Sequence, residues 1–248
     1  YYEFTIKTYL PLIFTRGAYN IRLQPGIDYQ QIGIWHDAGS GLSQGVDFMH
    51  IRTRISRFRR MAPRDFYPPW GQTLSVTMTE TMLDKGLYGN LYSVEAGLYF
   101  PGLAPQHYFY ITGGYQQQHL EKYYIPISRI DFPRGYQSTV SEKYSSVSFN
   151  YSFNVAYPDW SAAPFLFIKR LRLNLFYDLG YGVEAREFKA AGTRYFTGYY
   201  TSSGTEIVAD LHLIRFIFPI SAGTRLVYLP GRQKLQAELL FSINTGIF

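Results

Sequence analysis

Apolar and polar residues alternate with a period of two along most of the chain, which is the pattern of β-strands with two different faces. The clearest example is Tyr144–Tyr157, where Phe149, Tyr151 and Phe153 alternate with serine and asparagine. No long stretch has helical periodicity. An apolar, aromatic face opposite a face of small polar residues indicates strands with lipid on one side and water or polar side chains on the other.

The alternation, with the turn residues between the alternating segments, predicts about twelve strands. Pro25-Gly26 is expected to be a turn, and the polar segments 36–45, 119–143 and 181–204 are expected to be long loops at one end. Long loops at one end and shorter connections at the other are typical of outer-membrane barrels. The strands are expected near residues 2–10, 18–24, 28–35, 47–58, 72–82, 90–100, 107–117, 144–157, 170–180, 205–215, 221–229 and 234–248.

Composition supports the membrane interpretation. Aromatic residues make up 19% of the chain, including 24 Tyr and 19 Phe, while total hydrophobicity is an ordinary 46%. Tyrosine suits the two interfacial girdles of a barrel, because its ring is buried while its hydroxyl stays wet. No run approaches the roughly 18–20 apolar residues of a membrane helix, so a membrane-spanning chain must form a closed barrel.

The expected fold is therefore an all-β, transmembrane antiparallel β-barrel in which residues 1–248 form one domain. The alternative is a soluble β-sandwich or lipocalin-like barrel, whose outer surface would be charged. Here the polar faces consist largely of Ser, Asn, Thr and Gly, and they carry too few charged residues for a surface that faces solvent. The net charge of +6 is scattered along the strands, so no nucleic-acid partner is expected.

Three segments in the C-terminal half form a recognisable pattern. Pro133-Arg134-Gly135-Tyr136 looks like a (V/I)RG(F/Y) loop motif, Leu175–Gly180 looks like an F-x-D-x-G strand, and Phe241–Phe248 is similar to an aromatic-terminated last strand. Five predicted strands follow the Arg-Gly motif. Residues 105–248 thus resemble the barrel of the BamA/TamA superfamily, the bacterial surface antigen type, which inserts or moves proteins across outer membranes.

The resemblance implies roles for particular residues. It assigns a lumenal lock, formed by a long loop folded into the barrel, to Arg134, Gly135, Tyr136, Asp178 and Gly180. It assigns an assembly signal to Phe241, Ile243, Gly246 and Phe248. The chain departs from the family in three ways: about twelve strands instead of sixteen, no periplasmic POTRA domain, and no lumenal glutamate near Asn154, where the family carries one. The chain is thus either the C-terminal part of a longer protein or a divergent, smaller member.

Physical reasoning favours contact between Arg134 and Asp178. A guanidinium in a partly dehydrated lumen is costly unless a carboxylate meets it, and strand parity places Asp178 on the non-lipid face. Gly135 lets the backbone turn tightly beside the charge. The alternative is that the two are unrelated, exposed polar residues.

Other candidate chemistry is weaker. Gly41–Gly45 matches G-x-S-x-G but lies in a loop between strands, whereas a nucleophile elbow needs a strand before it and a helix after it. His36 with Ser40 or Ser43 faintly resembles the site of outer-membrane phospholipases. A basic strip, His50, Arg52 and Arg54, is expected to face the lumen, either as an anion path or paired with acids such as Glu95 or Asp210.

The sequence thus predicts a non-enzymatic component of protein assembly or transport in the bacterial outer membrane. A porin-like channel and an outer-membrane lipid hydrolase are the alternatives. Expected partners are outer-membrane lipid, lipopolysaccharide and other outer-membrane or periplasmic proteins. No cofactor is expected, because the five histidines are dispersed without metal-ligand spacing and no nucleotide-binding motif is present.

Overall fold

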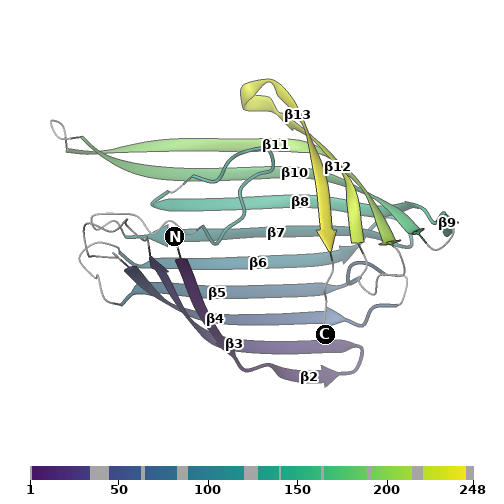
Figure 1. The fold of residues 1–248 in the computed structure, drawn as a ribbon, viewed down its shortest axis with the longest axis horizontal. Coiled ribbons are helices and arrows are strands. Elements are labelled where there is room, and N and C mark those ends of the chain that lie inside the picture. Colours follow the sequence, from purple (N-terminus) through teal and green to yellow (C-terminus); the bar gives the residue numbers. More distant parts are fainter. Residues whose placement is uncertain are drawn as a thin grey trace.

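The protein is all-β, with thirteen strands in a single antiparallel sheet (Figure 1). The structure, a computed structural model, describes residues 2–33, 45–62, 65–82, 89–119, 128–139, 141–162, 165–188, 192–213 and 220–243. The strands are β1 (Tyr2–Tyr9), β2 (Leu12–Arg16), β3 (Tyr19–Gly33), β4 (Gly45–Arg59), β5 (Gly71–Thr81), β6 (Leu91–Pro101), β7 (His107–Gln118), β8 (Lys143–Ala156), β9 (Trp160–Ala162), β10 (Leu166–Phe188), β11 (Gly192–Leu213), β12 (Ile220–Leu229) and β13 (Lys234–Ile243), with a short 3-10 turn at Pro230–Arg232.

The sheet is strongly curled. The strand order is β1-β3-β4-β5-β6-β7-β8-β10-β11-β12-β13, with β2 added to β3 and β9 added to β10. Strands β12 and β13 at one edge and β1 at the other curve in front of the middle strands (Figure 1). The closed barrel expected from the sequence is not completed by the described strands, because β1 and β13 do not pair with each other. Since eleven antiparallel strands lie side by side, these two edges run in the same direction.

The two faces of the sheet differ as the alternation predicted. On β5, Leu74 and Val76 are 42% and 45% exposed on the convex face, whereas Ser75 and Thr77 are 7% and 4% exposed on the concave face. The same alternation holds on β10, where exposed Tyr177 neighbours buried Asp178. The large apolar side chains therefore point away from the concavity. No helix in the described ranges is long and apolar enough to cross a membrane.

The predicted turn at Pro25-Gly26 is wrong, because β3 runs straight through it. The carbonyl of Pro25 accepts from the Leu10 N–H at 3.0 Å, so this residue faces the edge where β1 gives way to β2. Proline lacks an N–H, and here the missing donor falls at the break between two partner strands. The ladder between β3 and β4 is consequently unbroken across Pro25.

The predicted long loop 181–204 is also wrong. Residues 181–188 and 192–204 instead extend β10 and β11, which pair with each other from Leu166↔Leu213 to Phe188↔Gly192. The segment is rich in aromatic and β-branched residues, which favour strands, and the Tyr181 and Tyr199 rings pack across the hairpin at 5.1 Å. Its glycines suggested a loop, but Gly182 and Gly198 lie beside the Tyr200 ring within the regular ladder. Two short strands, β2 and β9, were not predicted.

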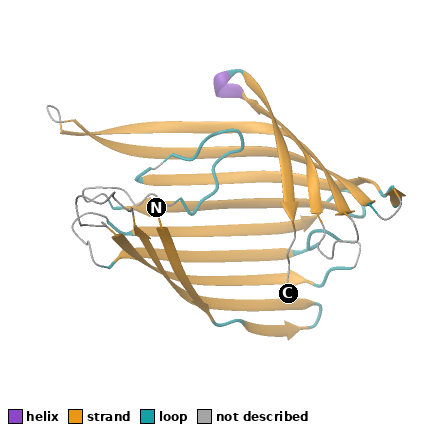
Figure 2. Cartoon of the chain, in the orientation of Figure 1, coloured by secondary structure: helices purple, strands orange, loops and turns teal. Residues whose placement is uncertain are grey.

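The connections sort to the two ends of the sheet. Segments 34–44, 82–90 and 119–142 join strands at one end, which we call the long-loop end. The links 60–70, 102–106 and 214–219 join strands at the other, short-connection end. Residues 128–139 turn back from the long-loop end and run along the concave side of the sheet (Figure 2).

Candidate functional site

The inward loop, residues 128–139, is fastened to the sheet at successive points. The carbonyl of Asp131 accepts hydrogen bonds from Ser146 Oγ at 2.8 Å and from the Tyr144 hydroxyl at 3.4 Å. The Phe132 ring stacks on the Tyr144 ring with centroids 4.2 Å apart and planes within 4°. Tyr144 is itself only 1% exposed. The loop therefore arrives at Arg134 with its backbone already held against β8.

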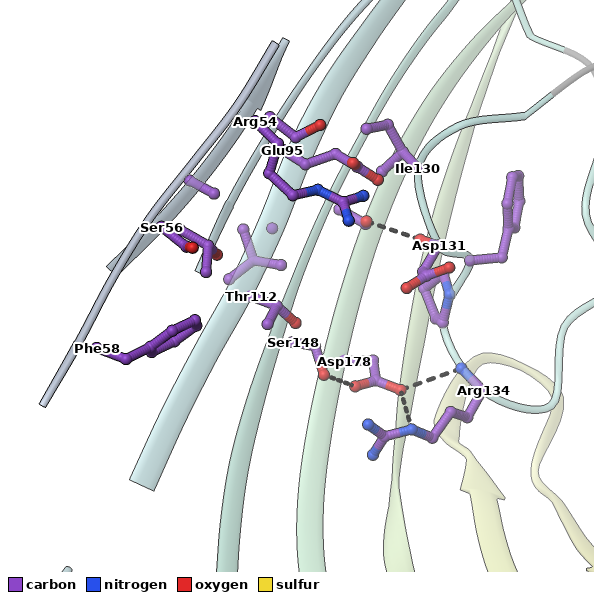
Figure 3. A pocket seen from close by; sticks show the side chains of 18 of the residues that line it. Arg54, Ser56, Phe58, Glu95, Thr112, Ile130, Asp131, Arg134, Ser148 and Asp178 are labelled. Carbon is purple, nitrogen blue, oxygen red and sulfur yellow. Dashed lines mark hydrogen bonds and ion pairs between the residues drawn. The ribbon is translucent and has the colours of Figure 1, made fainter. Parts of the chain in front are cut away.

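Arg134 and Asp178 are in contact, and the backbone makes the closer link. The Arg134 backbone N–H donates to Asp178 Oδ2 at 3.0 Å, while the guanidinium Nε lies 3.8 Å from the same oxygen (Figure 3). Ser148 Oγ donates to Asp178 Oδ1 at 2.5 Å, and Ser202 Oγ donates to Oδ2 at 3.2 Å. Asp178 is 3% exposed. This buried carboxylate thus acts mainly as an acceptor that holds the loop's backbone, since three donors converge on it.

The guanidinium of Arg134 has other partners. Its Nη2 donates to Asn150 Oδ1 at 2.8 Å, and its Nε lies 3.5 Å from Glu206 Oε1. The cationic group lies over the Phe176 ring at 4.1 Å from the centroid, a cation–π contact. The positive charge of Arg134 is thus shared between two carboxylates, Asp178 at 3.8 Å and Glu206 at 3.5 Å from Nε.

Glu206 is the functional residue that sequence reasoning missed. The resemblance placed a family glutamate near Asn154, but the Asn154 amide donates to the Tyr157 hydroxyl instead. The carboxylate near Arg134 comes from β11, two strands farther along. Parity on β11 was the available signal, because Glu206 and Asp210 lie four residues apart on the polar face of a strand with few other charges.

Glu206 also connects the loop to the C-terminal strands. Arg225 Nε donates to Glu206 Oε1 at 2.7 Å, and Arg225 Nη1 donates to Glu238 Oε2 at 2.8 Å. Asn174 Nδ2 donates to Glu206 Oε2 at 3.0 Å. A chain of alternating charges therefore crosses β10, β11, β12 and β13, and each buried charge in it has an opposite neighbour, as low-dielectric surroundings require.

Gly135 and Tyr136 complete the loop's contact with the wall. Gly135 has φ +81°, and a Cβ there would lie 3.0 Å from Val227 and 3.1 Å from Leu229, so conformation and space both favour glycine. Tyr136 packs on the buried group Phe176, Val227 and Leu229. Its hydroxyl donates to the Thr201 carbonyl at 3.2 Å.

Gly180 makes room for the loop. A Cβ at this position would lie 2.9 Å from Pro133 Cγ and 2.9 Å from the Tyr144 hydroxyl. Asp178 and Gly180 are two residues apart on one strand face, so the first binds the Arg134 N–H while the second accommodates the proline before it. The five residues assigned to the lumenal lock therefore lie together.

A second attachment reaches the opposite side of the concavity. Arg129 Nη2 donates to His50 Nδ1 at 2.9 Å, and the backbone N–H of Arg129 donates to Gln116 Oε1 at 3.0 Å. Because arginine only donates, His50 must accept at Nδ1, and its Nε2 lies 2.9 Å from Gln30 Oε1. Burial and the nearby guanidinium of Arg52 lower the pKa of Arg129. The loop thus bridges β4 and the C-terminal strands.

The basic strip on β4 does face the concavity, and one of its two expected partners is near it. Arg52 pairs with Asp28 at 2.7 Å, and Arg54 lies in the same register row as Glu95 and interacts with it electrostatically. Asp210, the other expected partner, instead pairs with Arg170, its register neighbour on β10, and with Arg172, two residues farther along that strand.

A cavity of about 660 Å³ lies between the loop and β3–β8. Arg54 and Glu95 lie across this cavity from Arg134 and Asp178 (Figure 3). Its lining combines Ser, Thr and charged side chains with apolar residues from the loop and from the wall, namely Ile130, Phe132, Pro133, Phe58, Ala96 and Val147. Its size and polarity suit water or a small polar solute.

The link between β4 and β5 also folds inward, at the short-connection end. Asp65 Oδ1 accepts from the Tyr108 hydroxyl at 2.7 Å, and the Phe66 ring packs on Tyr108 at 4.6 Å. The Tyr67 ring lies 4.7 Å from the Tyr110 ring. From the sequence, this segment was expected to be only a connection. In the structure its described residues form a second inward segment, at the short-connection end.

Of the remaining candidate residues, only Phe241 and Ile243 lie within the described ranges. Phe241 and Ile243, of the expected assembly signal, are 68% and 44% exposed on the edge strand β13. Gly246 and Phe248 lie outside the described residues, as do His36, Ser40 and Ser43. No group of three or more potential metal ligands occurs within the ranges that the structure describes.

A scan against protein-family models found no match for the chain, and a search of curated proteins found no relative. The loop and its anchors therefore carry the functional argument.

Proposed function

We propose that this chain is part of the wall, with the plugging loop, of a BamA-like outer-membrane barrel that assists the insertion or transport of other proteins. The observation that carries the proposal is the loop's fastening by consecutive residues. Arg134, Gly135 and Tyr136 engage a carboxylate on β10, a glycine-sized gap beside β12 and an apolar group contributed by β10 and β12. This arrangement matches what the resemblance implies for the lumenal lock.

The convex face supports a membrane location in the bacterial outer membrane. Exposed apolar side chains cover it from β4 to β12, including Ile51, Val76, Val94 and Leu175 at 41% to 48% exposure. A contiguous apolar surface of this extent needs a partner, and lipid is the partner that fits a belt around a curled sheet with a polar interior.

Function is tested by reconstituting the purified chain into lipid vesicles and adding an unfolded outer-membrane protein diluted from urea. We expect faster folding of that protein than with empty vesicles, and we expect Asp178→Ala, which releases the loop, to change the rate. Equal rates for empty vesicles, wild type and variant would contradict an assembly role.

A porin-like channel is the second candidate, and the polar cavity favours it. Single-channel recording in planar bilayers separates the two. A barrel with two inward segments should conduct little and flicker, whereas a porin should show large, steady openings. A large, steady conductance that is unchanged in Asp178→Ala would favour the channel.

A further inference from the structure

Arginines collect at one margin of the apolar convex face. On the outer side of β3, β4 and β5, residues Leu23, Ile55 and Leu74 are register neighbours and form an apolar row. Two residues farther toward the short-connection end, Arg57 lies beside Ile21 on β3. Along the outer face of β4, the surface thus changes from apolar at Ile55 to cationic at Arg57, the next residue on that face.

The next row contains two more arginines. Tyr19 pairs with Arg16 on one side and with Arg59 on the other. All three arginines, Arg16, Arg57 and Arg59, are exposed. Ser56 and Phe58, which alternate with them, line the cavity instead, so the arginines point to the convex side. No carboxylate in the described part of the chain forms an ion pair with them.

Aromatic side chains occupy the same level. The Arg57 guanidinium lies over the Tyr19 ring at 4.3 Å. The Arg59 N–H donates to the Trp70 carbonyl at 2.9 Å, and the Trp70 ring packs on Phe100 at 5.5 Å. Exposed tryptophan and tyrosine at the edge of an apolar belt mark the level of lipid headgroups.

We propose that Arg16, Arg57 and Arg59 form a binding site for the phosphate groups of anionic phospholipids in the membrane leaflet at the short-connection end. Guanidinium groups bind phosphate in a bidentate manner, and these three lie where headgroup phosphates would be while acyl chains cover Leu23 and Ile55. The inference rests on the proposed membrane location. With the long loops facing outward, this leaflet is the inner one, so phospholipid and not lipopolysaccharide is the ligand.

Continuity with the apolar rows distinguishes a lipid from a soluble anion. A free phosphate would gain nothing from Leu23 or Ile55, whereas a lipid contacts both surfaces at once. The cations are also spread along the rim on β2 and β4, on either side of β3, as several headgroups require, instead of converging on one point.

The test is binding of phosphatidylglycerol and phosphatidylcholine to the purified barrel in neutral detergent, with retained lipids counted by native mass spectrometry. Each cation near an anionic lipid surface contributes about fivefold in affinity. The triple variant Arg16→Gln, Arg57→Gln, Arg59→Gln should therefore bind phosphatidylglycerol about 100-fold more weakly. Arg→Lys at the same three positions should retain most of the affinity, because the charge remains.

Lys143→Gln is the matched control, since Lys143 is an exposed cation on the outward parity of β8 at the long-loop end. It should leave phosphatidylglycerol binding unchanged. Equal binding by wild type and the glutamine triple variant, or loss caused only by Lys143→Gln, would overturn the inference. Equally tight binding of inorganic phosphate would also overturn it, in favour of a soluble anion.

The two proposals fail in different ways. A chain that does not fold into phosphatidylcholine vesicles would contradict the membrane location and this site together. A chain that folds into such vesicles but shows no preference for phosphatidylglycerol over phosphatidylcholine would overturn the lipid site alone.

Discussion

Charged side chains on the two sides of the cavity differ in how they are paired. On the C-terminal wall, formed by β8 and β10–β13, Arg134 and Arg225 lie among Asp178, Glu206 and Glu238 in one connected chain. On the N-terminal wall, formed by β1 and β3–β6, Arg22 and Arg54 line the cavity, and neither makes an ion pair within the described ranges. The loop is bound tightly to the first wall and touches the second through Arg129 and His50.

The difference indicates which wall defines the position of the loop. A network in which every charge has an opposite neighbour is rigid, because removing a member leaves a neighbouring charge with fewer partners. An open polar surface allows water to replace contacts at little cost. Substitutions on the C-terminal wall should therefore have much larger effects than equivalent substitutions on the N-terminal wall.

The largest effect is expected for Asp178→Ala. It removes the acceptor of three donors and leaves Arg134 short of one carboxylate, so the free energy of unfolding should fall by about 3–5 kcal/mol. Arg134→Ala should cost less, about 1–2 kcal/mol, because its backbone N–H still reaches Asp178. Urea unfolding in detergent micelles, followed by tryptophan fluorescence, measures both.

Asp28→Ala is the matched control on the N-terminal wall. Its partner Arg52 is 31% exposed, so solvent screens the pair and about 1 kcal/mol is expected. If Arg134→Ala proved as damaging as Asp178→Ala, the guanidinium and not the backbone would be the main link. Equal losses for Asp28→Ala and Asp178→Ala would contradict the difference between the walls.

A smaller effect is expected for Gly180→Ala. The added methyl group would press on Pro133 at 2.9 Å, and overpacking of this kind costs about 1–3 kcal/mol. Combining it with Pro133→Ala should recover part of the loss, and a double-mutant cycle gives the coupling. Gly182→Ala is the control, because its methyl group would lie 3.2 Å from the Ser141 hydroxyl oxygen and at ordinary contact distance, 3.5 and 3.6 Å, from the Tyr144 and Tyr200 rings. Purely additive effects would show that the loop does not press on β10.

The smallest effect is expected on the N-terminal wall, for His50→Leu. The substitution removes the acceptor of the Arg129 side chain and should cost about 1 kcal/mol. His50→Gln, which keeps an acceptor oxygen, should cost less. Cysteine cross-linking between positions 50 and 129 would report whether the contact persists. A loss as large as that of Asp178→Ala would show that both walls hold the loop equally.

Much of the fold could be predicted from the sequence because strand parity is a local property. The inward position of Asp178 and of the β4 basic strip followed from alternation alone. The errors arose in segments whose residue types are typical of turns or loops but whose backbone forms a strand. Pro25-Gly26 has turn residues but lies opposite a break in its partner strand, and the glycines of the β10–β11 hairpin fit beside tyrosines in a regular ladder.

The partners within the site were harder to predict. Parity placed Asp178 on the inward face, and the cost of an unpaired charge favoured contact with Arg134, but neither could show that the backbone N–H makes the shorter contact. Glu206 reaches the guanidinium because the register aligns Asn174 with Glu206, and register between strands depends on pairing across the whole sheet. The inward fold of Phe66 and Tyr67 depends likewise on distant tyrosines on β7.

The length of the β10–β11 hairpin has a further consequence. Strand β11 pairs with β12 only from Ser203 onward, and β10 pairs with β8 only up to Val183. Among the described residues, the stretch from Gly192 to Ser202 therefore has a sheet neighbour on one side only. Gly192–Phe196 and Glu184–Phe188 pair only with each other and extend beyond β8 as a two-stranded arm, roughly 17 Å long at about 3.4 Å per residue. Its amides should exchange with solvent deuterium sooner than those of the same strands within the wall.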